Sequence, residues 1–525
     1  MLMKQCYLEN NPLKLFTFIL VLFVFTFAPD LSKAQATYQP YSYQFYQKFN
    51  KVQYSWETKQ HTAVKPIIID SIMLPLYDSL MNVGVRERSS WFGRKLWNEH
   101  LIDVQEEDFT FYADFIPDFQ IGRDFAGQGK TTWLNTRGFQ AGGSIKDKFF
   151  FYTSGYENQG VFPEYINDYI TENRVVPGQM YGKLGSDEQD WTYVSALVSY
   201  FPAKNLNFSL AYDKNFIGDG YRSMLLSDIS SNSTSFKFNG TFGDISISSI
   251  WSYMLDPREK INEDNRRSGS QRKWGAFQYL DWNVDNRFSV GLFHSLLWGN
   301  RKSDLESSLL EPGIDYRNGV KSMMQIGLNS KYKVLPNASL YGQLLLNKKM
   351  AAQIGFRGFD AFGIKNFNFL GEYNFAKPYT YANEDPLASY SNYSQPLAHP
   401  FGANFREFVG ILNYSYSKFD FSLQGNYGTY GLDPLLENGM RDNYGKDIYK
   451  PYNKDLAYDG SIGQGLKTNM MYVDGRVSYV LNPKYNLRLE VGGVLRRESN
   501  NEWKKNTGML TLGLRASFRN LYYDF

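Results

Sequence analysis

The segment "NFIGDGYRSMLLSDISSN", residues 215–232, brings charged and aromatic side chains close together in the chain. Two carboxylates, a guanidinium group and a phenol can bind a polar ligand through hydrogen bonds and ring stacking; they belong to Asp219, Tyr221, Arg222 and Asp228. The glycines on either side of Asp219 allow a sharp turn. These charges either meet a ligand or pair with carboxylates of a surrounding wall, in which case the segment is a structural constriction.

Residues that could support catalysis or a metal site are few. The chain has four histidines, none at ligand spacing from another His or from a Glu; they are His61, His100, His294 and His399. The stretch "DFAGQGKTTW", residues 124–133, partly matches a phosphate-binding loop, but Asp124 stands where the motif requires glycine. We predict that the protein is not an enzyme, has no metal site and uses no cofactor.

The first 36 residues have the features of a secretory signal peptide. Lys4 and Lys14 precede an apolar run that is short for a membrane anchor, and Ala34 and Ala36 form an A-x-A site, so we expect cleavage after Ala36. The one cysteine, Cys6, precedes the apolar run, so the mature chain is expected to form no disulfide. A net charge of +3 gives no reason to expect a nucleic-acid partner.

Strict alternation of apolar and polar residues recurs from about residue 109 to the end. It is clearest in "NLNFSLAYDK" (205–214), "FDFSLQGNYG" (419–428) and "YNLRLEVGGVL" (485–495). This period of two predicts strands with one apolar face. The chain holds 40 Tyr, 40 Phe and 10 Trp, yet its mean hydropathy is −0.44. Many aromatic rings in a chain that is polar on average are typical of a transmembrane β-barrel.

Short and long connections alternate between these strands along the chain. Tight turns are expected at 145–148, 202–205, 243–244, 284–287, 335–338, 364–366, 416–418 and 482–484, and the longest polar loops at about 159–190, 375–402 and 430–466. Outer-membrane barrels have short periplasmic turns and long extracellular loops. Together with a first strand near 109–120 and a last near 509–518, the turns give about 18 strands. We predict an all-β fold, a single antiparallel barrel over residues 109–525, in the cell outer membrane.

The two ends of the mature chain lead to separate expectations. Residues 37–108 are irregular and partly helical, with Ser89 or Ser90 as a helix cap and Pro75 limiting helix, so we expect a periplasmic or plug segment. At the other end, alternate residues from Leu510 to Phe518 are expected to face lipid. The terminal Phe525 would then end the last strand, as in the sorting signal of outer-membrane proteins.

The expected extracellular loops contain groups that could meet ligands. Segment 215–232 lies on this side by the order of turns, but its apolar residues 224–226 are unsuited to an exposed tip, so we expect it to fold into the lumen. The loop 262–273 is basic and either contacts acidic polysaccharide or lipopolysaccharide phosphates, or is a solvated loop. Loops 381–396 and 443–460 mix Tyr with Asp and Asn, which suits sugar binding or a calcium ion.

One region resembles a known family. "NFIGDGYRSMLLSD" (215–228), "FYTSGYENQGVFPEY" (151–165), "VPGQMYGK" (176–183) and "NTRGFQAGGSI" (135–145) are similar to segments of Wzi-type capsule-assembly proteins and of related gliding-motility proteins. The resemblance covers residues 109–228, and the sequence of the motif is closer to that of the gliding-motility proteins than to that of the capsule-assembly proteins. It implies an 18-stranded outer-membrane barrel, a small helical element at the periplasmic end, and association with exported polysaccharide.

These observations lead to one main functional hypothesis. We expect a non-enzymatic outer-membrane barrel that associates with surface polysaccharide, either capsule or exopolysaccharide, and supports surface attachment or gliding motility. Asp219, Tyr221, Arg222 and Asp228 are the predicted polysaccharide contacts, and outer-membrane lipids and lipopolysaccharide are further expected partners. The alternative is a structural subunit of an outer-membrane secretion or motility complex, whose loops meet other outer-membrane proteins. A diffusion channel is a third reading, which a filled lumen would argue against.

Overall fold

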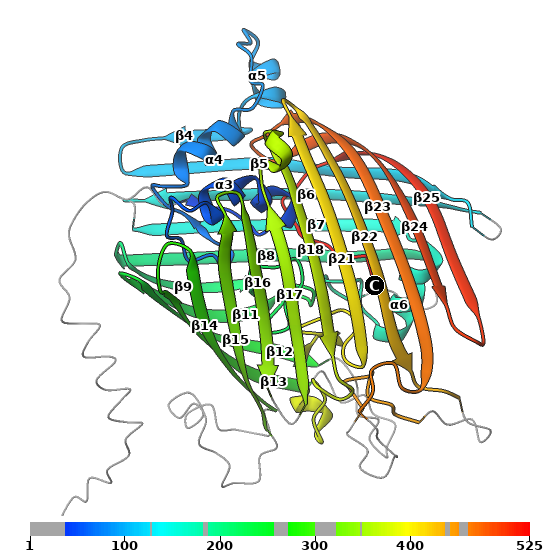
Figure 1. The fold of residues 1–525 in the computed structure, drawn as a ribbon. Helices are drawn as coiled ribbons and strands as arrows, with labels where there is room; N and C mark the ends of the chain where they lie inside the picture. The colour runs from blue at the N-terminus through cyan, green and yellow to red at the C-terminus, as the bar shows by residue number, and fades with distance from the viewer. Residues whose placement is uncertain are drawn as a thin grey trace, which may run out of the picture.

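The computed structural model describes residues 37–126, 129–146, 148–181, 187–256, 271–299, 322–346, 349–435, 442–450 and 460–525. The expected signal peptide and residues 262–270 of the basic loop lie outside these ranges. The fold is a closed antiparallel barrel of 18 strands, in which the last strand pairs with the first. The predicted fold class and the strand count are therefore confirmed (Figure 1).

The wall strands follow one another around the barrel in chain order. They are β5 (Phe109–Asp124), β6 (Lys130–Ile145), β7 (Phe149–Val161), β8 (Glu188–Ala203), β9 (Leu206–Asp213), β11 (Ser233–Phe242), β12 (Ile245–Asp256), β13 (Gln271–Asn283), β14 (Phe288–Gly299), β15 (Ser322–Leu335), β16 (Ala338–Leu346), β17 (Met350–Gly358), β18 (Phe367–Ala376), β21 (Phe405–Tyr416), β22 (Phe419–Leu432), β23 (Leu466–Asn482), β24 (Leu487–Ser499) and β25 (Lys504–Arg515). Each predicted tight turn joins two neighbouring strands of this wall.

Shorter elements lie before the wall and in its long connections. The first group is β1 (Thr37–Tyr38), α2 (Tyr43–Tyr46), η1 (Gln47–Phe49), α3 (Asn50–Tyr54), β2 (Val64–Lys65), β3 (Ile68–Ile69), α4 (Leu74–Met81), α5 (Trp91–Trp97) and β4 (Ile102–Gln105). The second is α6 (Glu164–Asn173), β10 (Phe216–Ile217), η3 (Ala361–Gly363), η4 (Pro386–Ala388), β19 (Ser391–Asn392) and β20 (Gln395–Pro396).

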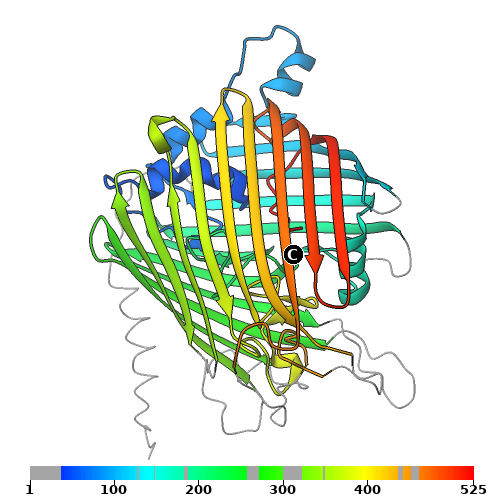
Figure 2. The ribbon, with the colours of Figure 1, turned by 45° about the vertical axis from the view of Figure 1, so that its right-hand side comes forward.

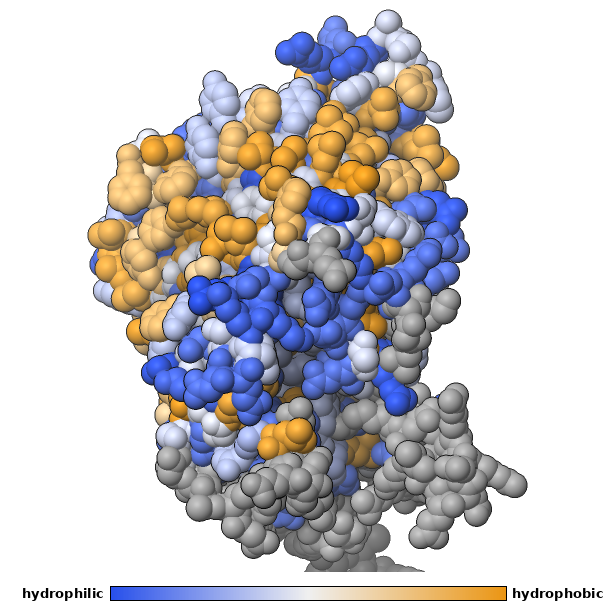
Figure 3. Space-filling view, turned by 90° about the vertical axis from the view of Figure 1, so that its right-hand side faces the viewer, coloured by the Kyte–Doolittle hydropathy of each residue, from blue (hydrophilic) through white to orange (hydrophobic). Residues whose placement is uncertain are grey.

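The outward face of the wall carries an apolar belt. Side chains such as Phe115, Leu210, Ile354, Val491 and Leu510 are more than half exposed, although water would disfavour so large an apolar surface. On the face that Figure 3 draws, hydrophobic side chains gather over the upper part of the wall, with hydrophilic side chains below them. A closed barrel with such a belt satisfies every backbone hydrogen bond within lipid. The protein is an outer-membrane barrel.

No helix in the described ranges has both the length and the apolar character needed to cross a bilayer. Helices α4 and α5 instead lie at the end of the barrel that has the short turns, the periplasmic end (Figures 1 and 2). Ser90 caps α5 as predicted, since its hydroxyl accepts a hydrogen bond from the Gly93 amide at 3.1 Å. Pro75 does not prevent a helix: it lies in the first turn of α4, where proline is tolerated.

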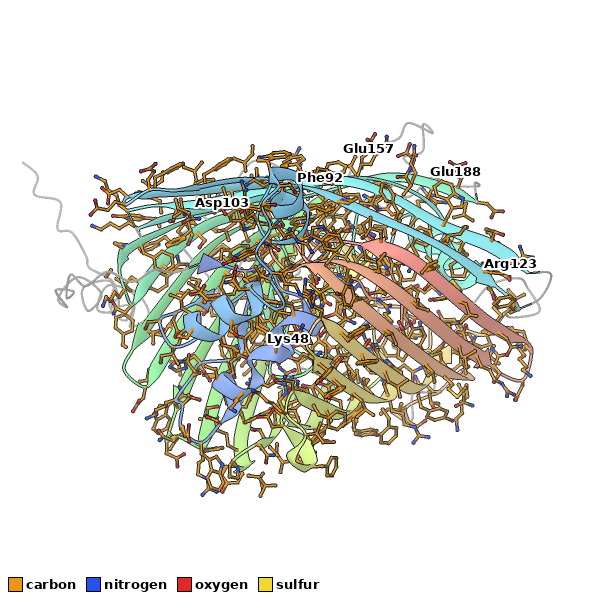
Figure 4. The ribbon with its side chains drawn as sticks, turned by 90° about the horizontal axis from the view of Figure 1, so that it is seen from above. Lys48, Phe92, Asp103, Arg123, Glu157 and Glu188 are labelled. Carbon is orange, nitrogen blue, oxygen red and sulfur yellow. The ribbon has the colours of Figure 1, made fainter. Side chains whose placement is uncertain are left out.

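The lumen is filled by segments from distant parts of the chain, which we call the plug. The N-terminal residues 37–70 lie across the periplasmic mouth, where Lys48 forms a 2.9 Å ion pair with Asp420 of the wall (Figure 4). Segment 215–232 passes through the interior and pairs with the N-terminal region through β10 and β2. The connection from 377 to 404 and the C-terminal residues complete the plug.

The end of the chain corrects one prediction. Strand β25 ends at Arg515, and residues 516–525 turn into the lumen, so Ala516 and Phe518 are buried in the interior instead of facing lipid. The turn occurs at Ser517, whose φ of 105° is incompatible with a continuing strand. Phe525 lies against helix α6, with its ring centroid 4.5 Å from that of Tyr169. We call residues 516–525 the C-terminal tail.

Candidate functional site

Segment 215–232 is buried inside the barrel, as its apolar residues predicted. Met224, Leu225 and Leu226 pack in the main hydrophobic cluster of the lumen. Gly220 is required by a close approach, because a Cβ there would lie 2.3 Å from Glu372 Oε1. This approach lets the Glu372 carboxylate accept hydrogen bonds from the backbone amides of Tyr221 and Arg222.

Arg222 is the best-connected side chain of the segment, and it is completely buried. Its Nε and Nη2 donate to the two carboxylate oxygens of Glu407 at 3.2 and 3.0 Å. Its Nη1 and Nη2 donate to the carboxylate of Asp524, in the C-terminal tail, at 3.2 and 3.0 Å. The rings of Tyr221 and Tyr522 flank the guanidinium group. Arg222 therefore fastens the tail to the wall.

The two carboxylates beside Arg222 have further partners. Asn426 of the wall donates to Glu407 at 3.1 Å and to Asp524 at 3.0 Å. His399, from the 377–404 connection, lies 2.7 Å from Glu407. Burial lowers the pKa of His399. We call Arg222, Glu407, Asp524, Asn426 and His399 the lumen cluster.

Asp219 and Asp228 are also held by protein partners. Asp219 accepts hydrogen bonds from Tyr54 and Asn329, both at 3.1 Å, and from Thr62. Burial opposes its ionisation, but the nearby cations of Lys331 and Lys65 and these donors lower the pKa of Asp219 to about 2.

Asp228 accepts from Asn520 at 3.0 Å and from the Tyr522 hydroxyl at 2.7 Å. Both donors belong to the C-terminal tail. Burial raises the pKa of Asp228. Segment 215–232 thus holds the tail at two points: Tyr221 and Arg222 both donate to Asp524, and Asp228 accepts from Asn520 and Tyr522.

A cavity of about 180 Å³ lies beside the C-terminal tail, and we call it the tail cavity. Its walls are formed mainly by strands β5, β6 and β21–β25 on one side and by tail residues 516, 517, 519–521 and 523 on the other. Aromatic residues that line it are Tyr43, Trp133, Phe162, Tyr165, Tyr221, Tyr472 and Tyr523, and residues with amide side chains are Gln44, Gln120, Asn413, Gln424, Asn486 and Asn520.

Paired charges run along the wall of the tail cavity. Arg515 bridges Asp118 and Glu490, with its Nη1 3.3 Å from Glu490, and Arg488 donates to Glu490 at 3.0 Å. The next pair is Arg476 and Asp474. Such polar groups beside aromatic rings can hydrogen-bond to hydroxyls and stack on the apolar face of a sugar.

Buried Lys65 gives the plug a predicted pH response. Its Nζ donates to the Gly218 carbonyl at 2.7 Å, and burial lowers the pKa of Lys65 to about 7. Between pH 7 and about 10.5 the unfolded chain then holds more protons than the folded one, so the free energy of unfolding rises with pH. We expect Lys65→Met to remove on the order of 1–3 kcal/mol of this rise.

The measurement is the thermal unfolding midpoint in detergent at pH 7 and at pH 9.5. The exposed Lys365 in a periplasmic turn supplies the control, Lys365→Met, which should keep the wild-type rise. Equal rises in all three proteins would contradict a neutralised Lys65.

The sequence predictions and the structure overlap at one residue of the tail cavity. Tyr221 lines it, whereas Asp219, Arg222 and Asp228 do not, and sugar binding by the four residues remains a prediction. The arginines of the cavity wall were missed, although inward positions in alternating strands were the available signal. In the described ranges, no group of His, Cys, Asp and Glu side chains is arranged to hold a metal ion.

Comparison with known proteins gives structural neighbours only. No family model matches the chain, and no curated protein matches it. Wzi, a carbohydrate-binding β-barrel of Escherichia coli involved in group 1 capsule assembly, is similar at 13% identity and a TM-score of 0.48, over 76% of this chain and 85% of Wzi. OprD of Pseudomonas aeruginosa is similar at 11% identity and a TM-score of 0.38, over 80% and 98%.

OccAB2 of Acinetobacter baumannii is similar at 9% identity and a TM-score of 0.39, over 78% of this chain and 97% of that protein. These identities are low, and the likeness concerns the barrel fold alone. The resemblance to gliding-motility proteins remains a prediction.

Proposed function

We propose that this protein is a non-enzymatic outer-membrane barrel that associates with exported surface polysaccharide and supports surface attachment or gliding. The observation that carries the proposal is the tail cavity, whose aromatic, amide and paired charged side chains suit a sugar. Pockets that enclose drug-sized ligands span about 300–1,000 Å³. The tail cavity, at about 180 Å³, is smaller and suits a sugar residue of a chain.

The filled lumen argues against a diffusion channel. Barrels of 16–18 strands can leave an aqueous pore, but here the plug occupies the interior and its central side chains are buried. A polysaccharide chain with one sugar residue in the tail cavity could also make weak contacts with several extracellular loops. Together these contacts would bind the polymer more tightly than any one of them alone. In this proposal Tyr221, which lines the cavity, contacts the sugar, and Arg222 and Asp228 act indirectly by holding the C-terminal tail in place.

A second function has one observation in its favour. Helix α5 exposes Trp91 and Phe92 by 58% and 68% at the periplasmic end. Exposed neighbouring aromatic residues are typical of protein contacts. This suits the alternative of a structural subunit in a secretion or motility complex, and loss of a co-purified partner in Trp91→Ala/Phe92→Ala would favour it.

Filling the tail cavity tests polysaccharide binding. Gln120 and Thr511 line the cavity from β5 and β25. We expect Gln120→Trp/Thr511→Trp to lower the polysaccharide retained by the purified barrel by about tenfold, because the added rings occupy the space of a sugar residue. The measurement is pull-down of the cells' own surface polysaccharide.

The control is Ile121→Trp, which adds the same ring on the outward face of β5, where Ile121 is 59% exposed. Deleting the gene should in parallel move polysaccharide from the cells to the medium. Unchanged retention by the cavity-filled protein would exclude the tail cavity, and an unchanged distribution in the deletion strain would exclude the anchor role.

A further inference from the structure

A row of cations lies on the outward face of the wall at the extracellular end. It is formed by Arg406 of β21, Lys467 of β23, Arg497 of β24, Lys504 of β25 and Arg123 of β5, all of them exposed. These strands, with β22 between the first two, are consecutive in the wall. We call the five residues the basic row.

Strand pairing places Arg406 and Lys504 at the two ends of one line across the sheet. Arg406 pairs with Thr429, Thr429 with Asn469, Asn469 with Ser499 and Ser499 with Lys504. Directly paired residues share one face of a sheet. Between the two cations, the side chains of Asn469 and Ser499 are half-buried and Thr429 is buried.

The cations of the basic row have no acidic partner among the described residues. This differs from their immediate neighbours: Arg496 faces the lumen and pairs with Glu498 at 3.0 Å, and Lys505 pairs with Asp168 of α6. Arg123 donates to a neutral group, the Thr131 hydroxyl, at 2.8 Å. Within the part of the chain that the structure describes, the positive charges of the row are thus not neutralised by carboxylates.

The basic row also borders the apolar belt. Leu495, Phe408 and Ile121 are the next outward residues toward the periplasm from Arg497, Arg406 and Arg123, and they are 59%, 55% and 59% exposed. A ligand at the row would therefore lie against lipid-facing surface below its charged group. Figure 3 shows the hydrophilic surface directly adjoining the apolar one on this side of the molecule.

We infer that the basic row binds the phosphate groups of an anionic glycolipid in the outer leaflet, whose acyl chains lie along the adjoining belt. Guanidinium and ammonium groups pair strongly with phosphate, and the half-buried Asn469 and Ser499 beside the row suit the sugar that carries it. A soluble polymer or a protein would match the charge but would leave the adjoining apolar surface to other lipids. This inference does not depend on the tail cavity.

The test titrates detergent-solubilised full-length barrel with bisphosphorylated lipid A and with its dephosphorylated form. The variant is Arg406→Gln/Arg497→Gln/Lys504→Gln. Three exposed lysines of periplasmic turns supply the matched control, Lys148→Gln/Lys204→Gln/Lys365→Gln. Near an anionic surface each cation contributes several-fold to affinity, so we expect the variant to bind the phosphorylated lipid at least about tenfold more weakly.

The control variant should bind like the wild type, and the dephosphorylated lipid should bind all three proteins weakly and equally. Equal affinity of wild type and variant for the phosphorylated lipid would overturn the inference. So would tight binding of the dephosphorylated lipid, or binding of an acidic polysaccharide without acyl chains that is lost in the same variant. Because all substituted residues are exposed, each protein is expected to keep its wild-type unfolding midpoint.

Discussion

Arg222→Ala is expected to prevent stable folding of the barrel. The substitution leaves Glu407 and Asp524 as buried carboxylates without their cation. Breaking a buried ion pair in this way costs about 3–5 kcal/mol, a large part of the stability of a typical domain. The measurement is the fraction of compact, heat-modifiable protein on unheated gels, together with the thermal unfolding midpoint in detergent.

Two further variants test whether the loss of stability comes from the lumen cluster and not from the removal of any arginine. Arg94→Ala removes a cation from α5 whose side chain is 40% exposed and pairs with Glu99, so less than about 1 kcal/mol should be lost. Arg222→Lys keeps the charge, but its single ammonium group cannot donate to both carboxylates in the planar geometry of a guanidinium group. Its thermal unfolding midpoint should therefore lie between those of the wild type and Arg222→Ala. A wild-type midpoint for Arg222→Ala would show that the cluster does not hold the plug.

The wall could be predicted from sequence because its signals are local. Alternation places side chains on two faces within each strand, and turn residues mark the ends, as in the hairpin between β21 and β22. The same signals placed Phe421, Leu423 and Tyr427 on one face, and all three are exposed to the outside. The position of segment 215–232 in the lumen could also be predicted, because its apolar residues 224–226 are unsuited to an exposed loop.

The interior could not be predicted, because it depends on contacts between distant residues. Arg222 meets Glu407 and Asp524, which are 185 and 302 positions away in the chain. The C-terminal tail continues the alternation of β25, so its local pattern indicates a strand. Only the backbone at Ser517 and the partners in the lumen turn it inward. The tail cavity, which exists because of that turn, has no signature in the sequence.

Removal of the C-terminal tail is expected to convert a closed barrel into a conducting one. The tail forms one side of the tail cavity, and its Asp524 and Tyr522 connect it to Arg222 and Asp228. Without residues 516–525 the cavity joins the space that the tail occupied, and a barrel of this size has room for an aqueous channel. In planar bilayers we expect wild type to show no steady conductance and the truncated protein to open in discrete steps.

The control is Trp91→Ala/Phe92→Ala on α5 at the periplasmic end, where these side chains are 58% and 68% exposed, and it should stay closed. If truncation prevents folding, the full-length chain with Ser517→Cys gives an independent measurement, because Ser517 is 8% exposed and the expected mature chain has no other thiol. A polar maleimide should label it slowly in the intact barrel and quickly when Asp524→Ala weakens the hold of Arg222. A folded truncated barrel that stays closed, or fast labelling of Ser517→Cys alone, would mean that the N-terminal and 377–404 parts of the plug close the lumen without the tail.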